Sequence, residues 1–217
     1  MMHFSTKKLV TVAMLCAIAY VVMYFGRIPI VLFLSYEAKD VIIAIGGFIY
    51  GPLTAFIISL IVSVVEMFMA SDTGWIGCLM NILSTCSFAC TAAFIYKKKR
   101  TLMGAVVGLL VGCLLMVMVM LLWNYLITPI YMGYPREAVA ALLLPAFLPF
   151  NLLKGGLNAT ITILLYKPVV TALRRAGFVE SADPGHIGHS QKIGIVLVAV
   201  VVLVTCVFFA LVLKGVL

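Results

Sequence analysis

The sequence predicts an all-α integral membrane protein with a bundle of six membrane-spanning segments and an additional C-terminal transmembrane helix. Of its 217 residues, 65% are hydrophobic, and the mean hydropathy is +1.25, whereas roughly half of the residues are apolar in soluble proteins. Several apolar runs reach or exceed the 17 to 25 residues or so that cross a bilayer core. These runs have no polar face to turn towards water, so the sequence has room only for loops and one short linker outside the membrane.

The spans follow one another with short connections. The first apolar run follows Lys7 and Lys8 and lacks the small-residue cleavage site of a signal peptide, so it is expected to remain as a span. Residues 41–70 are too many for one ordinary span, and Gly51-Pro52 in their middle ends one helix and opens the next. This region is therefore expected to cross twice, the first time with a short helix. The other expected spans are residues 9–26, 75–96, 102–127, 149–172 and 193–213.

Basic residues predict the orientation of these spans. With Lys7 and Lys8 in the cytoplasm, two crossings within 41–70 place the run Lys97 to Arg100 in the cytoplasm as well. The same count places Lys167 and Arg175 on the cytoplasmic side. The surplus of 15 Lys and Arg over 7 Asp and Glu thus indicates topology, not a nucleic-acid partner. The expected parts are a membrane domain over 1–175, a cytoplasmic linker over 176–192 and a further span over 193–213. The expected outer loops are 27–39, 70–74 and 128–144.

A polar stripe marks the sixth span. Asn151, Lys154 and Asn158 lie within about 80° of one another on a helix, and such residues are costly in hydrocarbon unless they face a cavity or a partner. Lys154 could instead extend to the outer headgroups, and each asparagine could form an interhelical hydrogen bond. Three together favour a binding site, and Gly155 and Gly156 would let a flat ligand or a neighbouring helix approach the backbone.

Other polar groups are expected near the same outer level. Asn124 ends the fifth span, Glu66 and Asp72 end the third, and Asn81 with Ser84 forms a pair in the fourth that is equally typical of helix packing. Charges in the first outer loop would ordinarily be solvated.

Small residues and cysteines are expected to serve packing. Ala13 and Ala17 form one small-residue face, and Gly104, Gly108 and Gly112 form another, each suited to internal packing or to docking another membrane subunit. The six cysteines lie in apolar runs without a C-x-x-C or zinc spacing, and no hydrolase, metalloprotease or nucleotide-binding motif occurs. The sequence therefore predicts neither an enzyme nor a metal site.

Five blocks of the sequence resemble the riboflavin-binding substrate subunits, or S components, of energy-coupling factor (ECF) vitamin transporters, over about residues 5–175. The blocks are YEAKDVIIAIGGFIYGPLTAFIISLIVSVVE, GWIGCLMNILS, IYKKKRT, MLLWNYLITPIYMG and PFNLLKGGLNATITILLYKPVV. The resemblance implies a six-helix protein of the bacterial cell membrane that captures riboflavin with high affinity at the extracellular side. It also implies as partners a transmembrane coupling subunit (T component) and two cytoplasmic ATPases, with riboflavin as the transported ligand and no cofactor.

The resemblance also implies site residues. The N-x-x-K of the last family helix corresponds to Asn151 and Lys154, and the asparagine of the fifth helix to Asn124. Asn158 is available for the ribityl hydroxyls. Contacts from the first loop fall on Tyr36, Glu37, Lys39 and Asp40, and the alanine pair that contacts the coupling subunit falls on Ala13 and Ala17. The family usually ends after the sixth helix, so residues 193–213 depart from its pattern.

The alternatives are another flavin or vitamin, a membrane enzyme, or a purely structural subunit. A phosphorylated flavin (FMN) would call for arginines near the outer mouth, where only Arg27 and Arg136 are available. Thiamine would favour Glu37 or Glu66 as the critical residue, and a pterin remains a further vitamin of the same class. An enzyme acting on lipids is expected to carry clustered Asp, His or metal ligands, and this chain has three histidines.

Overall fold

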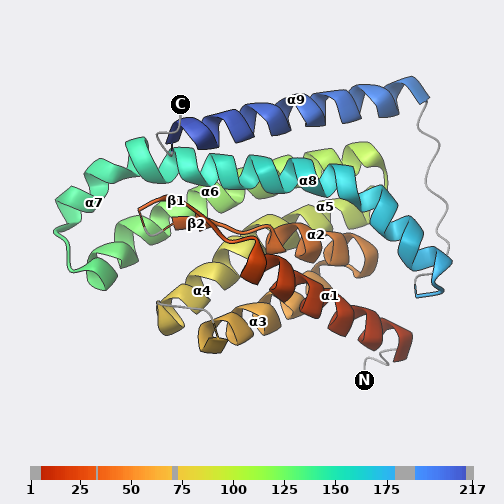
Figure 1. The fold of residues 1–217 in the computed structure, drawn as a ribbon, viewed down its shortest axis with the longest axis horizontal. Helices are drawn as coiled ribbons and strands as arrows, with labels where there is room; N and C mark the ends of the chain where they lie inside the picture. Colours follow the sequence, from red (N-terminus) through yellow and green to blue (C-terminus); the bar gives the residue numbers. More distant parts are fainter. Residues whose placement is uncertain (1–5, 33, 70–72, 179–188, 214–217) are drawn as a thin grey trace.

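The computed structural model describes residues 6–32, 34–69, 73–178 and 189–213. Within them the chain is mostly helical, and its strands form one short hairpin (Figure 1), which confirms the predicted all-α fold class. Six helical stretches are long and apolar enough to cross a membrane. The structure places the following elements in chain order: α1 Thr6–Phe25, β1 Ile28–Val31, β2 Leu34–Tyr36, α2 Lys39–Tyr50, α3 Pro52–Met69, α4 Gly74–Thr85, η1 Cys86–Cys90, α5 Thr91–Lys98, α6 Leu102–Met132, α7 Arg136–Leu142, η2 Leu143–Phe147, α8 Leu148–Arg175 and α9 His189–Leu213.

The region between the first and fourth spans contains two helices, as predicted. Helix α2 ends at Gly51, whose φ of +96° breaks the helix, and Pro52 starts α3. With 12 residues, α2 is roughly 18 Å long at 1.5 Å per residue. It starts in the middle of the molecule, because the antiparallel β1–β2 hairpin leads the chain there from the end of α1 (Figure 1).

The predicted outer loop over 128–144 is wrong, because most of it is helical. Helix α6 continues past Pro129 to Met132, and Gly133 then ends it in the left-handed conformation with φ +66°. Helix α7 begins after Pro135, and two π-helical segments occur: η2 joins α7 to α8, and η1 joins α4 to α5. Prolines are tolerated in the helices of membrane bundles, because neighbouring helices and side chains can satisfy the freed backbone groups.

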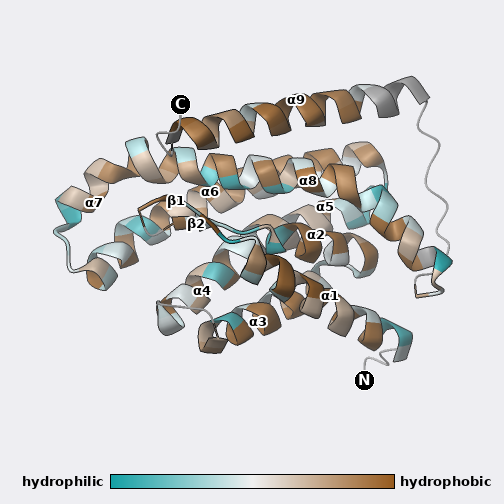
Figure 2. Cartoon of the chain, in the orientation of Figure 1, coloured by the Kyte–Doolittle hydropathy of each residue, from teal (hydrophilic) through white to brown (hydrophobic). Residues whose placement is uncertain are grey.

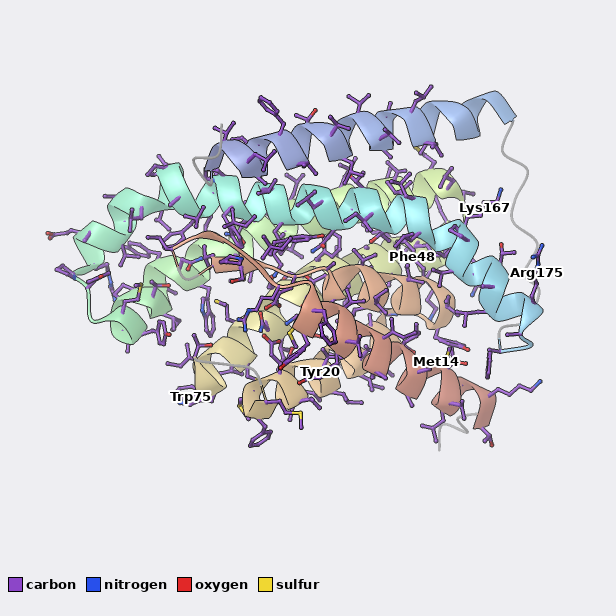
Figure 3. The ribbon with its side chains drawn as sticks, viewed as in Figure 1. Met14, Tyr20, Phe48, Trp75, Lys167 and Arg175 are labelled. Atoms are coloured by element: carbon purple, nitrogen blue, oxygen red, sulfur yellow. The ribbon has the colours of Figure 1, made fainter. Side chains whose placement is uncertain are left out.

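The two ends of the molecule differ in character. Trp75 lies at one end, with the hairpin and α7, whereas Lys167 and Arg175 lie at the opposite end, towards the start of α1 (Figure 3). The basic turn between α5 and α6 lies at this second end as well (Figure 1). This segregation is the pattern on which the predicted orientation depends.

Close helix contacts account for the glycines of α6. A Cβ atom on Gly108 would lie 2.7 Å from the carbonyl oxygen of Ala92, and one on Gly112 would lie 2.4 Å from that of Phe88. These glycines therefore face α5 and η1 inside the protein, so internal packing is confirmed for them and the alternative of a docking face is wrong. The same contacts bring α6 close to the fourth span and define one wall of the interior.

Helix α9 lies antiparallel along α8 on the outside of the bundle (Figure 1). It begins at His189 instead of at residue 193, and its described residues are almost uniformly hydrophobic (Figure 2). Hydrophilic residues are found instead near the centre of the molecule, where β2 leads into α2 (Figure 2). That central region holds the candidate site.

Candidate functional site

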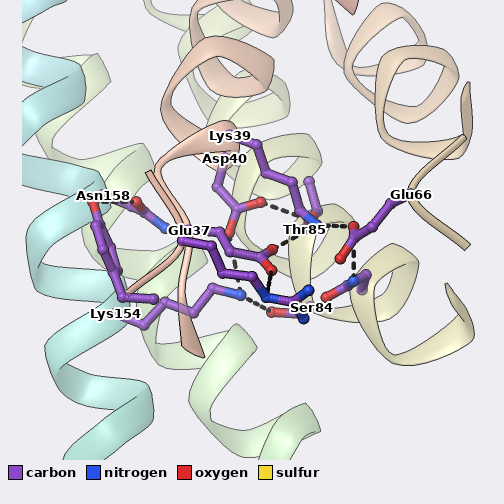
Figure 4. A network of polar contacts seen from close by, with 11 residues as sticks. Glu37, Lys39, Asp40, Glu66, Ser84, Thr85, Lys154 and Asn158 are labelled. Carbon is purple, nitrogen blue, oxygen red and sulfur yellow. Dashed lines mark hydrogen bonds and ion pairs between the residues drawn. The ribbon is translucent and has the colours of Figure 1, made fainter. Parts of the chain in front are cut away.

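A buried cluster of charges lies where β2 leads into α2. Lys39 is completely buried, and its ammonium group forms ion pairs with Glu66 of α3 and, at 2.7 Å, with Glu37 (Figure 4). The expectation that charges in this segment would be solvated is wrong, because the hairpin carries Glu37 inside and Lys39 and Asp40 form the first turn of α2. Burial of this many charges requires that they neutralise one another.

The cluster is balanced in charge. Arg27 pairs with Glu37 at 3.2 Å, and the Asn81 amide donates to Glu66 at 3.0 Å. Burial acts to raise the pKa of Glu37, but the positive charges of Lys39, Lys154 and Arg27 outweigh it and hold that pKa below its usual range. Glu37 is therefore an anion at neutral pH, which keeps Lys39 and Arg27 paired.

The polar stripe of α8 meets this cluster from the opposite side (Figure 4). The Lys154 ammonium lies 3.5 Å from the Asp40 carboxylate and donates to Ser84 Oγ at 3.4 Å. The Asn158 amide donates to Asp40 at 3.1 Å and accepts a hydrogen bond from the Tyr36 hydroxyl at 3.0 Å. Lys154 is only 7% exposed, so the alternative in which it extends to the outer headgroups is wrong.

A cavity opens above the cluster, with about 570 Å³ of space that includes its open mouth. Asn124 and Asn151 line it, and each amide also donates to a carbonyl one turn earlier in its own helix, Met120 O at 2.7 Å and Phe147 O at 2.8 Å. These local bonds fix the orientation of both side chains. The residues lining the cavity are Arg27, Leu34, Ser35, Glu37, Thr73, Met80, Asn81, Ser84, Met120, Asn124, Phe150, Asn151 and Lys154.

The structure divides the predicted site residues into two groups. Four of them line the cavity, namely Asn124, Asn151, Lys154 and Glu37. The other four are buried, and they contact this first group or one another. They are Tyr36, Lys39, Asp40 and Asn158.

Sequence reasoning missed Thr85 and left Asn81 with Ser84 undecided. Thr85 is completely buried, and its hydroxyl donates to Asp40 at 2.6 Å. Asn81, Ser84 and Thr85 occupy one face of α4 at helical spacing, which is the signal that could have identified them. A polar face on an apolar helix points to the interior. Its partner Asp40 on α2 is 45 residues away in sequence, however, so local patterns do not reveal the contact.

The glycines of α8 serve helix packing. A Cβ atom on Gly155 would lie 2.3 Å from Cys113 Sγ of α6, and one on Gly156 would lie 3.0 Å from Cys206 Sγ of α9. The sequence left open whether these glycines admit a flat ligand or a neighbouring helix, and the structure shows a neighbouring helix beside each of them. All six cysteines are free thiols.

The cavity can bind a molecule that combines polar edges with apolar faces. Leu34, Met80, Met120 and Phe150 supply apolar walls, whereas the asparagines offer both donors and acceptors. Among the described residues, no group of three or more His, Cys, Asp or Glu side chains could hold a metal ion. The arrangement suits recognition of a largely uncharged ligand.

Known proteins with similar sequences are transporters. The family "ECF transporter, substrate-specific component" matches residues 7–166. Riboflavin transporter RibU of Staphylococcus aureus (strain TCH60) is 30% identical over 181 residues, which cover 79% of this chain and 94% of that protein. Riboflavin transporter FmnP of Bacillus subtilis (strain 168) is 31% identical over 188 residues, which cover 79% of this chain and 98% of that protein.

A solved structure shows the same fold. It is described as "Structure and mechanism of the S component of a bacterial ECF transporter" and aligns with a TM-score of 0.66 at 29% identity, over 77% of this chain and 98% of its own. These relatives are transport proteins and not enzymes. This multi-pass membrane chain, with its open and partly polar cavity, thus belongs to the family of substrate-specific components of ECF transporters.

Proposed function

We propose that this chain captures riboflavin with high affinity at the extracellular side and is the substrate-specific subunit of an ATP-driven importer. The choice of ligand rests on the cavity between α6 and α8, whose wall contains Asn124, Asn151 and Lys154. It is supported by the identity of about 30% to riboflavin transporters.

The chemistry of this wall matches that of a flavin. One edge of the isoalloxazine ring alternates carbonyl and N–H groups, which an asparagine amide can match as both donor and acceptor and a lysine as donor. The dimethylbenzene end suits the apolar wall formed by Met80, Met120 and Phe150. The ribityl hydroxyls need neutral polar partners, and Asn81 and Ser84 line the same cavity.

The balance of charges favours riboflavin over FMN and thiamine. Arg27, which FMN would use for its phosphate, already pairs with Glu37 at 3.2 Å. Glu37 and Glu66, which thiamine would use for its cation, both pair with Lys39. FMN would have to break a partly exposed ion pair and thiamine a buried one in order to bind, whereas a neutral vitamin would break neither.

The test is a titration of the purified, detergent-solubilised protein with riboflavin, monitored by quenching of flavin fluorescence. We expect saturation at one ligand per chain, and we expect FMN and thiamine to compete weakly. A colourless protein that does not quench riboflavin fluorescence would rule out riboflavin as the ligand.

Two features support the rest of the proposal. The cavity lies towards the end that carries Trp75 and the hairpin, away from Lys167 and Arg175 (Figure 3), so basic-residue bias makes that end extracellular and the N-terminus cytoplasmic. Ala13 and Ala17 are exposed on one face of α1, where small residues allow close helix contact. That face is the proposed contact with the coupling subunit, which would connect the chain to two cytoplasmic ATPases.

A further inference from the structure

Helix α9 lies outside the region that defines the family. The family match ends at residue 166, and the solved S component aligns over 98% of its own chain but only 77% of this one. In the structure α9 nevertheless packs along α8, the helix that carries Asn151 and Lys154 (Figure 1).

One face of α9 makes this contact. Ala199 is buried, and Leu203, Cys206 and Ala210 pack against the cluster formed by Tyr36, Leu153 and Leu157. These positions recur every three or four residues, so they lie along one stripe of the helix. The opposite side is exposed, as Val204 shows at 62%.

The residues under this stripe are sequence neighbours of predicted site residues. Leu153 precedes Lys154, Leu157 precedes Asn158, and Tyr36 precedes Glu37. Both leucines and the tyrosine are less than 10% exposed, and α9 supplies part of that cover. A Cβ atom on Gly156 would lie 3.0 Å from Cys206 Sγ, which is tighter than an ordinary van der Waals contact, so one of the two would have to shift.

Tyr36 connects this contact to the ligand cavity. Its hydroxyl donates to Asn158 Oδ1 at 3.0 Å, and the Asn158 amide donates to Asp40 at 3.1 Å. Asp40 in turn lies 3.5 Å from the Lys154 ammonium that lines the cavity. Each of these groups is at least nine-tenths buried, so a shift of Tyr36 would leave a buried polar group without its partner.

We infer that α9 is a positioning element of the substrate site: its Leu203–Cys206–Ala210 face presses Tyr36 and α8 together and thereby sets the position of Lys154 in the cavity. Without this cover, the Tyr36 ring would face lipid, and its hydroxyl would be drawn towards the outer headgroups and away from Asn158. Leu203, Cys206 and Ala210 do not line the cavity, so they act through Tyr36 and α8. The inference rests on the proposed function, because its readout is riboflavin affinity.

The first test places a large side chain in the contact of α9 with α8 and Tyr36, in the full-length protein. Cys206→Phe should weaken riboflavin binding about ten-fold, because overpacking displaces α8 or Tyr36. Val204→Phe is the matched control, since it adds the same ring to the exposed side of α9 and should leave affinity unchanged. Both affinities are measured by quenching of flavin fluorescence.

Two further variants separate positioning from a general loss of stability. Gly156→Ala should weaken binding, and the pair Gly156→Ala with Cys206→Ala should restore it, because removing Sγ makes room for the new methyl group. In a Tyr36→Phe background, Cys206→Phe should have a smaller effect than in the wild type, since the hydroxyl that carries the coupling is absent.

The outcomes distinguish this inference from the proposed function. Wild-type protein that does not bind riboflavin overturns the proposed function and this inference with it. Wild-type binding with equal affinity in Cys206→Phe and Val204→Phe overturns the inference alone. The inference is also overturned if Gly156→Ala weakens riboflavin binding and Cys206→Ala fails to restore it. It is overturned as well if the effects of Tyr36→Phe and Cys206→Phe on affinity are fully additive.

Discussion

Lys39 holds two carboxylates together in a part of the molecule that solvent does not reach. An ammonium between two carboxylates would leave one negative charge in excess, and Arg27 offsets it by pairing with Glu37. On the other side of the cluster, Lys154 and Asp40 form a second pair. The site therefore presents polar groups without net charge, which matches a neutral ligand.

Removing the central cation should destabilise the protein. Lys39→Met leaves Glu37 and Glu66 buried side by side, and breaking a buried pair in this way costs about 3 to 5 kcal/mol. We expect a clearly lower temperature of thermal unfolding in detergent, whereas Lys97→Met at the exposed basic turn should change it little. Adding Glu37→Gln and Glu66→Gln to Lys39→Met should recover part of the loss, and no recovery would contradict this account.

Lys154 is the charged residue of α8 that faces the cavity. Lys154→Ala should weaken riboflavin binding by about ten-fold or more, because it removes a donor and leaves Asp40 without its cation. Lys167→Ala provides the control on the same helix, since that residue is exposed at the far end. Equal affinity of the two variants would remove Lys154 from the site.

At the scale of elements, two kinds of irregularity shape the interior. The hairpin and the short α2 bring the chain to the centre of the bundle, where Asp40 meets Thr85 of α4 and Asn158 of α8. Helix α6 contacts α5 and η1 closely through Gly108 and Gly112. Further along the same helix, Asn124 lines the cavity. The position of the site thus follows from how closely the helices can approach.

The glycine contact is testable by a single methyl group. Gly112→Ala places a Cβ atom 2.4 Å from the backbone oxygen of Phe88, so α6 and η1 must separate at a cost of about 1 to 3 kcal/mol. Gly194→Ala in α9 meets nothing within 4 Å and should be neutral or stabilising, because alanine favours helix. Thermal unfolding of the two variants should therefore shift in opposite directions, or by clearly different amounts.

At the scale of the whole molecule, the binding site and the proposed docking face lie on different surfaces. Ala13 and Ala17 face outward from α1, whereas the cavity is lined by α4, α6, α8 and the hairpin segment. Under the proposed function, one surface would bind ligand while the other would contact the coupling subunit. Uptake would then need both surfaces, and binding would need only one.

Bulky residues on the docking face should separate these two activities. Ala13→Leu with Ala17→Leu should leave the riboflavin affinity of the isolated protein unchanged but strongly reduce uptake by cells, because the small-residue contact is filled. Ala141→Leu, on the exposed surface of α7, is the control and should affect neither. Uptake at the wild-type level in the double variant would place the coupling contact elsewhere.

The sequence by itself determined the helical membrane class, the break at Gly51-Pro52 and the polar stripe of α8. These features are local: hydropathy over about 20 residues, the backbone limits of glycine and proline, and the 100° spacing of a helix require no knowledge of distant contacts. The helical course of 128–144 escaped the same reasoning, because prolines and glycines that usually mark loops are tolerated within a bundle.

Only the tertiary structure decided which polar residues meet and which side of each glycine is covered. Glu37, Lys39 and Asp40 look like solvated loop charges in sequence, yet they are buried because the hairpin returns into the bundle towards Glu66 and Lys154. The partners of Lys39 and Asp40 on α3, α4 and α8 lie 27 or more residues away in the chain. Whether a charge is solvated or paired depends on its neighbours in space, and these are set by packing of the whole bundle.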